Sequence, residues 1–509
     1  MKSLLAAVSA AALLAAAAPA AKPLPPRPQN MAHEIFYQIF TRSMRDSNGD
    51  RQGDLTGIRE SLPYLQRLGV TSILLTPLYP SSFYHNYFAS SFEGVDPEFG
   101  TMADFRALVA AVHARGMKIY LDEEFQYVAY DHPWFTGTFR HPGKNPGFLI
   151  YHGPGNTDPE SGPFGLTMAA RFPSGETGIT TLDMTKPGFE QWAQKYLLSW
   201  VDPNHDGDFS DGVDGFRLDH MMDDLDDKPI NKGLFDAFWK PLFARVRSVN
   251  PRIRFIAEQS GWGYAPEYLK PGLADAVFAF PLAGAIRSFD KAKIADAIRK
   301  TAAATPPGKY QLVFVENHDM NRIASDPGVT PEKLRTAISL SILLKGVPLL
   351  YYGEELGMKG KVRPEYKSDA KDIGDREAFR WSADDEAPGE AIWYKGPKSY
   401  WTQRFNRSHD GVSVAEEQDD PASLLNHSRR LIALRRAHPA LEDGDQNILP
   451  SPDGLLVVER TLGKERLRIV SNLTDRPVRY PAARDLIGEA QSQGGALLLK
   501  PYETALISE

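Results

Sequence analysis

The chain has 509 residues, 42% of them hydrophobic and 24% charged, so it is long enough for one large catalytic domain together with smaller domains. Its 58 basic and 65 acidic residues give a formal net charge of −7 without a basic run, so neither nucleic acid nor an anionic membrane surface is an expected partner. The chain contains no cysteine, which excludes disulfides as a source of stability.

The N-terminus has the pattern of an export signal. Lys2 precedes an apolar run over residues 4–18, and the small residues at 18–20 suit a cleavage site. We therefore expect residues 1–21 to be a signal peptide and the mature protein to be exported, to the periplasm or to the medium. A membrane anchor is the alternative, but the run is short and rich in alanine, and we expect no membrane association after signal removal. Nothing in the sequence indicates an oligomeric state.

Two acidic loops have the spacing of cation sites. In residues 46–54, oxygen-bearing side chains recur at alternate positions around Gly49, which is how a loop wraps a hard cation such as Ca²⁺. We expect structural calcium there, with a solvated turn as the alternative. Residues 202–208 have similar spacing but lack the distal glutamate of an EF-hand, so a metal site and a charged surface turn both stay open for them.

Apolar runs alternate with helical patterns along most of the chain, and repeated strand-then-helix units imply a parallel sheet. Eight such units favour an α/β fold of the (β/α)₈ TIM-barrel type over an open sheet, although periodicity does not show closure. Barrel enzymes place their chemistry where the strands end. The runs cover residues 34–40, 72–76, 118–122, 215–219, 254–258, 276–278, 311–316 and 348–352.

The predicted barrel carries an insertion and a C-terminal extension. Residues 125–185 are a Gly/Pro/aromatic stretch, too long for an ordinary loop, and predict a small inserted domain after the third strand. The barrel would then comprise residues 31–124 and 186–435. Alternating apolar and polar residues predict a C-terminal antiparallel β-domain over residues 436–509.

Three predicted strands end in carboxylates, namely Asp219, Glu258 and Asp319. Singly, each is more often a turn former, but together with Arg217 and His318 they predict a catalytic site. Retaining glycoside hydrolysis needs one carboxylate that attacks the anomeric carbon and a protonated one that donates to the leaving oxygen. Arg217 lies on the same strand face as Asp219 and would keep it ionised, whereas burial and like charge raise the pKa of the second carboxyl.

The segments GFRLD and ENHD, with the glutamate after an apolar strand between them, resemble signature regions of the α-amylase family, glycoside hydrolase family thirteen. The resemblance covers most of residues 31–509 and is nearest to bacterial members that act on oligosaccharides. It implies that Asp219 is the nucleophile, Glu258 the general acid/base and Asp319 the carboxylate that binds and distorts the sugar. It also implies that Arg217 and His318 are the supporting polar pair.

The resemblance extends to sugar and metal contacts. Tyr87 occupies the place of the tyrosine that stacks on the sugar beside the cleaved bond, with a packed core aromatic as the alternative. The first acidic loop resembles the calcium loop of oligosaccharide-acting members. Its implied ligands are Asp46, Asn48, Asp50, the Gln52 carbonyl and Asp54.

The remaining signature region departs from the family pattern, which reads Asp, three residues, Asn-His. This chain keeps Asp122 but has Gln126 and Tyr127 at the last two places. Asp122 and Tyr127 are expected to contact the sugar, while Gln126 puts in doubt the calcium that often sits beside the inserted domain, and we do not predict that metal. Phe88 also replaces a common polar residue. These changes suggest that the preferred substrate is a branched, cyclic or otherwise unusual α-glucoside rather than plain starch.

Together these features predict an enzyme that hydrolyses α-glucosidic bonds of oligosaccharides or α-glucans, with retention, through a covalent glycosyl-enzyme. Transglycosylation is the alternative, since an acceptor hydroxyl can replace water at the second step. A non-catalytic carbohydrate-binding barrel is the alternative of another class. The three strand-end carboxylates argue against it. Linkage and chain-length preference depend on loop shape, which sequence patterns do not specify.

Overall fold

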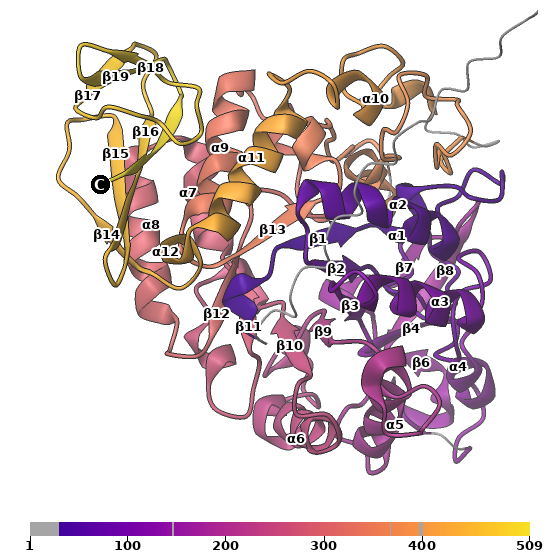
Figure 1. The fold of residues 1–509 in the computed structure, drawn as a ribbon. Helices are drawn as coiled ribbons and strands as arrows, with labels where there is room; N and C mark the ends of the chain where they lie inside the picture. Colours follow the sequence, from indigo (N-terminus) through magenta and orange to yellow (C-terminus); the bar gives the residue numbers. More distant parts are fainter. Residues whose placement is uncertain (1–29, 145–146, 367, 396–400) are drawn as a thin grey trace, which may run out of the picture.

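The computed structural model describes residues 30–144, 147–366, 368–395 and 401–509, and the predicted signal peptide lies outside these ranges. Its centre is a closed barrel of eight parallel strands (Figure 1), which confirms the predicted (β/α)₈ fold. Around the barrel the strands are β1 (Phe36–Ile39), β13 (Val347–Tyr351), β12 (Tyr310–Val313), β11 (Ala276–Phe278), β10 (Arg254–Ala257), β9 (Gly215–Leu218), β3 (Lys118–Glu123) and β2 (Ser72–Leu75).

The inside of the barrel is packed with apolar side chains. Phe36, Leu74, Ile256 and Leu349 point inward from four of its strands, and none is more than 1% exposed. A filled interior leaves no pore, so polar groups can collect only where the strands end. This arrangement puts the residues that follow β3, β9 and β10 at one common mouth, because these three strands are neighbours.

Helices surround the barrel. The helix α2 shows how the sequence sets their ends: the Asp54 side chain accepts a hydrogen bond from the Gly57 amide at its start, and Gly69 ends it with a φ of +100°. Among the described residues, no helix has the length and apolar character needed to cross a membrane. The longer helices are α2 (Leu55–Leu68), α3 (Met102–His113), α5 (Phe189–Val201), α6 (Lys240–Val249), α7 (Phe280–Ser288), α8 (Lys291–Ala304), α9 (Pro331–Leu343) and α11 (Leu424–Ala437), and the short ones are α1 (Thr41–Met44), α4 (Pro133–Thr138), α10 (Val414–Glu417) and α12 (Pro439–Glu442).

The segment inserted after β3 forms a small domain with an antiparallel sheet in the order β4-β8-β7. Lys228, from the segment that follows β9, holds this domain against the barrel. It donates hydrogen bonds to Glu160 at 3.0 Å and to the Ser161 hydroxyl at 2.9 Å. The inserted domain is therefore attached to the barrel on the side where the catalytic residues were predicted. Its strands are β4 (Tyr127–Ala129), β5 (Tyr151–His152), β6 (Asp158–Pro159), β7 (Met168–Ala170) and β8 (Glu176–Thr181).

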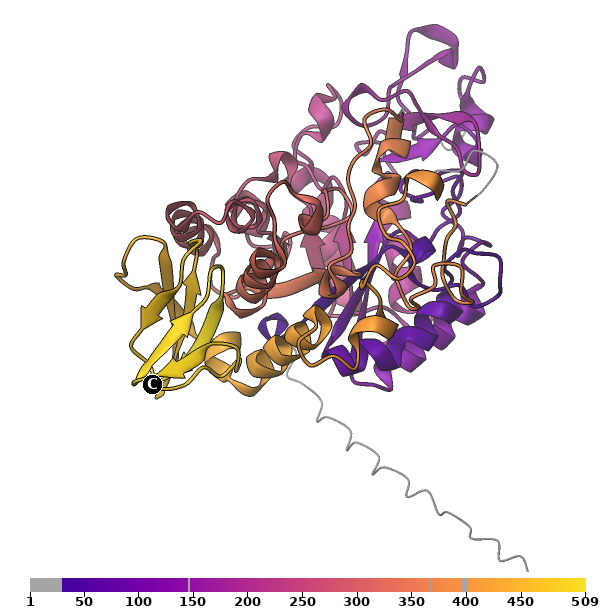
Figure 2. The same ribbon diagram turned by 90° about the horizontal axis from the view of Figure 1, so that it is seen from above.

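The C-terminal residues form two antiparallel sheets, as predicted, in the orders β14-β15-β16-β20 and β17-β19-β18. Figure 1 and Figure 2 both show this domain at the end of the molecule that is remote from the inserted domain. It therefore does not reach the mouth of the barrel. Its strands are β14 (Asp445–Ile448), β15 (Leu455–Leu462), β16 (Glu465–Asn472), β17 (Val478–Tyr480), β18 (Gln491–Gln493), β19 (Ala496–Leu499) and β20 (Thr504–Ser508).

Two buried arginines, one from α11 and one from the C-terminal domain, bond to the same end of helix α9. Arg435 of α11 donates hydrogen bonds to the carbonyls of Ile342 and Leu344, at 2.6 and 3.0 Å, where α9 ends. Arg460 of β15 donates to the Leu343 carbonyl at 3.0 Å. Carbonyls at a helix C-terminus lack partners within the helix, so these guanidinium groups complete the end of α9.

Candidate active site

A cavity of about 910 Å³ opens at the carboxyl ends of the barrel strands, next to the inserted domain. Asp219, Glu258 and Asp319 line it from the barrel, and Phe164 lines it from the inserted domain. Its volume is in the range of pockets that bury a small-molecule ligand, roughly 300–1,000 Å³. The three carboxylates predicted from the strand ends thus share one cavity.

Arg217 connects the carboxylates of three neighbouring strands. Its Nη1 donates to Asp122 Oδ1 at 2.8 Å and to Asp219 Oδ1, and its Nη2 lies 3.1 Å from Glu258 Oε2. The guanidinium is buried and faces all three carboxyl groups. A planar cation with several N–H groups is suited to this position, because a single ammonium could not reach them in this geometry.

Asp219 is the carboxylate that the site keeps ionised. Burial alone would raise its pKa, but attraction by Arg217 and then by His220 outweighs burial and lowers the pKa to about 2. An ionised carboxylate that faces the cavity is what a nucleophile at an anomeric carbon requires.

Glu258 has the opposite protonation behaviour. Burial raises its pKa to about 7 against the attraction of Arg217, and the negative charge of Asp219 adds to the rise. Its other contacts are long: the His220 amide donates to Oε2 at 3.4 Å, and the Trp262 indole donates to Oε1 at 3.3 Å. Glu258 can therefore hold a proton near neutral pH, as a general acid must.

Asp319 and His318 follow β12 and line the cavity. Burial opposes ionisation of Asp319, but His318 at 3.0 Å and Arg376 at 3.2 Å hold its pKa well below the ordinary value. Gln38 fixes the far side of the His318 ring through a 3.0 Å hydrogen bond. Asp319 is thus a charged acceptor that can bind sugar hydroxyls without taking part in proton transfer.

Tyr87 lines the cavity and is held at its hydroxyl. This hydroxyl lies 2.7 Å from Asp122 Oδ2 and 2.7 Å from His318 Nε2, and the tyrosine ring stacks on the His318 ring at 5.3 Å with 10° between the planes. Asp122 is fully buried between Tyr87 and Arg217, so it reaches the cavity through these partners. The structure therefore brings Tyr87, Asp122, Arg217 and His318 into one network.

Tyr127 lies behind the cavity wall. Its ring is fully buried, its hydroxyl donates to Asp226, and it packs edge-on against Phe88 at 6.3 Å and His220 at 5.7 Å. Asp226 draws the longer side chain away from the cavity. The expected direct sugar contact is therefore replaced by support of two residues, Phe88 and His220, that do line it.

Gln126 braces the turn that follows β9. Its side-chain amide donates to the carbonyls of Asp219 and His220, at 2.6 and 2.9 Å, and its oxygen accepts from the Phe125 amide at 2.9 Å. His220 has a φ of +44°, which is uncommon for a residue other than glycine. Gln126 thus stabilises a strained backbone at the point where Asp219 enters the cavity.

Several cavity residues had no signal in the sequence. Asp369, Asp372 and Arg376 come from a polar helical turn after β13, Ser368–Arg376, and His85 pairs with Asp369 at 2.7 Å. Asp369 also accepts from the Ala170 amide of the inserted domain at 2.8 Å. These residues close one side of the cavity with charged groups, and no motif in the sequence connects positions so far apart.

Two exposed aromatic side chains line the cavity, one beside His220 and one beside Glu258. Phe164 of the inserted domain is 78% exposed and packs edge-on against His220 at 5.2 Å. Trp262 follows β10, is 41% exposed and stacks on Phe280 at 4.5 Å. Exposed aromatic faces beside a polar pocket are suited to the apolar faces of sugar rings.

In the acidic loop before α2, the side chains of the expected ligands accept hydrogen bonds mainly from backbone amides. The Asp46 carboxylate accepts hydrogen bonds from the amides of Asn48, Gly49 and Arg51, and Asp50 accepts from the Gln52 amide. The Gln52 side-chain oxygen accepts from Arg42. Asp54 bonds both Ser47 and the first turn of α2. Carboxylate and carbonyl oxygens of this kind fit Ca²⁺.

The sequence of the chain matches the model of the α-amylase catalytic domain over residues 38–444. Alpha-amylase 3 of Dictyoglomus thermophilum is 28% identical to it, over 93% of this chain and 92% of the relative. A 4-alpha-glucanotransferase of Thermotoga maritima is 26% identical, over 93% of this chain and all of the relative. The crystal structure of an α-amylase from H. orenii superposes with a TM-score of 0.76 at 26% identity, covering 94% of this chain and 99% of that one.

Proposed function

Because the chain belongs to the α-amylase family and is a glycosidase of α-glucosidic bonds, we propose that it hydrolyses α-linked oligosaccharides with retention, using Asp219 as nucleophile and Glu258 as general acid/base. The observation that carries these roles is the contrast in protonation between two carboxyl groups that share Arg217. Ionised Asp219 can attack, and protonated Glu258 can donate.

In the first step, an Asp219 oxygen bonds to the anomeric carbon while the bond from that carbon to the leaving oxygen breaks. The Glu258 proton passes to the leaving oxygen, so the departing sugar leaves as a neutral alcohol. Arg217 stays near both carboxylates and offsets the negative charge that then develops on Glu258. Asp319 and the Tyr87–His318 pair hold the reacting sugar.

In the second step, ionised Glu258 takes a proton from water, and the water oxygen bonds to the anomeric carbon as the ester bond to Asp219 breaks. Two inversions at the same carbon leave the α configuration unchanged. An acceptor hydroxyl could enter in place of water. Trp262, beside Glu258, and Phe164, beside His220, favour this second candidate function, because they offer stacking surfaces in the cavity where an acceptor sugar has to sit.

Azide rescue tests the two roles with a matched pair of alanine variants. With α-glucosyl fluoride as substrate, Asp219→Ala leaves room for azide to attack directly and should yield β-glucosyl azide. Glu258→Ala still forms the ester, so azide replaces water and should yield α-glucosyl azide. NMR of the products distinguishes the anomers. The same anomer from both variants would contradict the assignment of roles.

We also propose that the preferred substrate is not plain starch. Phe164 and Phe88 make the cavity wall more apolar than a site built for polar contact along a linear chain. Initial rates on maltooligosaccharides, pullulan, cyclodextrins, isomaltooligosaccharides, sucrose and trehalose would identify the linkage. High efficiency on ordinary maltooligosaccharides would contradict this proposal.

We propose structural Ca²⁺ at Asp46, Asn48, Asp50, the Gln52 carbonyl and Asp54. The loop leads directly into α2 through Asp54, so a bound cation would stabilise the start of this helix without touching the cavity. Calcium at 100 times its Kd should add about 2.7 kcal/mol to the free energy of unfolding. Thermal unfolding with calcium and with EDTA measures this effect, and Asp50→Ala should abolish it. An equal Tm under both conditions would exclude the metal.

We propose, finally, that the protein is exported with loss of residues 1–21. The charged and apolar pattern of the N-terminus supports this proposal. N-terminal sequencing of protein recovered from the periplasm and from the medium of the producing cells would find the cleavage site and the compartment.

A further inference from the structure

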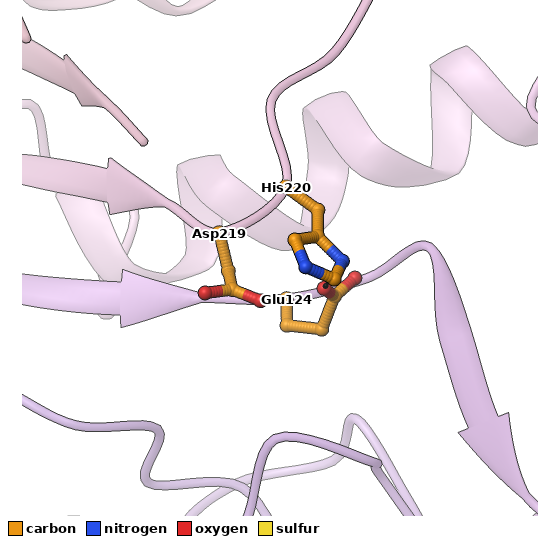
Figure 3. A group of neighbouring side chains, drawn as sticks. All are labelled: Glu124, Asp219 and His220. Atoms are coloured by element: carbon orange, nitrogen blue, oxygen red, sulfur yellow. Dashed lines mark ion pairs between the residues drawn. The ribbon is translucent and has the colours of Figure 1, made fainter. Parts of the chain in front are cut away.

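A second buried glutamate lies directly behind Asp219. Glu124 follows β3, is fully buried and contacts the end of the neighbouring strand β9 (Figure 3). A Glu124 carboxyl oxygen, an Asp219 carboxyl oxygen and a His220 ring nitrogen all lie within 4.8 Å of one another. Glu124 is not among the residues that line the cavity, so it can act on a sugar only through its neighbours.

The contacts of Glu124 leave one oxygen without a donor. Its Oε1 accepts from the Gln126 amide at 2.7 Å. No described group donates a hydrogen bond to Oε2, and His220 Nδ1, at 3.7 Å, is too far away. An Asp219 carboxyl oxygen lies within 4.8 Å of Glu124, and this carboxylate has no hydrogen to give when it is ionised. A buried acceptor that faces another acceptor is costly unless one of the two carries a proton.

The surrounding charges favour a proton on Glu124 rather than on Asp219. Burial raises the pKa of Glu124 well above its ordinary value, and the negative charges of Asp219 and Asp226 raise it further. Asp219 is instead attracted by Arg217, which donates to it directly, and by His220, against repulsion from Asp319. The proton shared between the two carboxyl groups therefore belongs on Glu124.

We propose that Glu124 is a positioning residue that donates its carboxyl hydrogen to the Asp219 carboxylate. This inference rests on the proposed role of Asp219 as nucleophile. A hydrogen bond to an ionised carboxylate is stronger than one to a neutral ester. Glu124 therefore stabilises Asp219 more before attack and after release than in the covalent intermediate, which makes Asp219 a better leaving group in the second step.

Three donor atoms this close also suit a metal ion. A cation bound here would take lone pairs that Asp219 needs for attack on the anomeric carbon, so it would inhibit the reaction. The protonated arrangement satisfies the same atoms and leaves the cavity-facing side of Asp219 free. The protonated arrangement, rather than a bound cation, is therefore compatible with catalysis.

Glu124→Gln and Glu124→Leu separate donation from packing, since the amide still donates and the leucine does not. Glu124→Leu should lower kcat by about 10- to 100-fold, the range expected when a hydrogen bond to a charged group is lost. Glu124→Gln should stay within a few-fold of the wild type. The second step is the one slowed, so Glu124→Leu should release a burst of nitrophenol from p-nitrophenyl α-glucoside. The KM of this variant for the same substrate should fall together with its kcat.

Glu123→Gln is the matched control, because Glu123 is an equally buried neighbour that accepts from Tyr196 at 2.6 Å on the other side of the strand. It should show neither the burst nor the change in KM. The acid limb of kcat/KM should move to higher pH in Glu124→Leu alone, since Asp219 loses a donor that keeps it ionised. Equal kinetics for the glutamine and leucine variants would overturn the inference.

Infrared difference spectra keep the inference testable even if Glu124→Leu does not fold. Wild type minus Glu124→Gln at neutral pH should show the loss of a protonated carboxyl band. The loss of an ionised carboxylate band instead would overturn the inference. Failure of the proposed function looks different, because the wild type would then give no product with retained configuration.

Discussion

The end of β9 and the end of β10 present two buried carboxylates that share one arginine, yet their environments differ. Asp219, after β9, receives Arg217 at close range and has Glu124, His220 and the braced turn around it. Glu258, after β10, has Arg217 at 3.1 Å and two contacts of 3.3 Å and 3.4 Å. Similar burial with different donors gives opposite protonation, so neighbours rather than exposure decide which carboxylate is the nucleophile and which the acid.

The largest expected effect comes from removing the acid. Glu258→Gln should lower kcat/KM by about 10²- to 10⁴-fold on substrates with poor leaving groups, the usual contribution of general acid catalysis. In the wild type, kcat/KM should fall as pH rises through about 7, because Glu258 loses its proton there. The variant should lack this limb. A base limb that persists in Glu258→Gln would assign it to another group.

A smaller effect is expected from loosening either turn. Gln126 braces the residues after β9, and Gln259 similarly donates to the carbonyls of Gly263 and Phe278 after β10. Gln126→Leu should cost about 1–3 kcal/mol of stability and about tenfold in kcat, since two buried carbonyls lose their donor. Gln259→Leu should lower stability by a similar amount, but it should change the fall of kcat/KM at high pH. Equal pH profiles for both variants would mean that neither turn sets the protonation of its carboxylate.

The smallest expected effect lies at the rim. Trp262→Ala should change hydrolysis only a few-fold, because about 1 kcal/mol of stacking is at stake. It should lower the ratio of transfer to hydrolysis at high sugar concentration, as should Phe164→Ala. Tyr264→Ala, a change just outside the cavity-lining set, is the control. An unchanged ratio in both variants would remove the argument for an acceptor site.

The barrel could be predicted because strand and helix patterns repeat, but the limits of single strands could not. The run 311–316 reads as one strand, yet β12 ends at Val313, because Phe314 and Val315 stay buried after pairing stops. Apolar patterning reports burial, and burial continues beyond the hydrogen-bonded ladder. The run 276–278, bounded by a turn and a helix, matches β11.

At the site, the strand-end carboxylates could be located from sequence because each ends or closely follows an apolar run. Glu124 could not be located in this way, because a glutamate within a buried segment does not indicate a functional role until its partner is known. Asp369 meets His85 only through the fold, 284 positions away along the chain. Tyr127 could be located from the sequence, but its partner could not. The tyrosine is longer than the histidine of the family pattern, and its hydroxyl bonds to Asp226 instead of reaching the cavity.

Arg435 and Arg460 have a consequence for how the molecule unfolds. Their guanidinium groups bond to carbonyls at the end of α9, next to a barrel strand, so α11 and the strand β15 of the C-terminal domain complete the barrel's own hydrogen bonding. Detaching that domain would leave buried carbonyls unsatisfied at the junction. The barrel and the C-terminal domain should therefore melt in a single cooperative transition. Recombination with other barrels should succeed only when α11 and β15 are inherited together with α9.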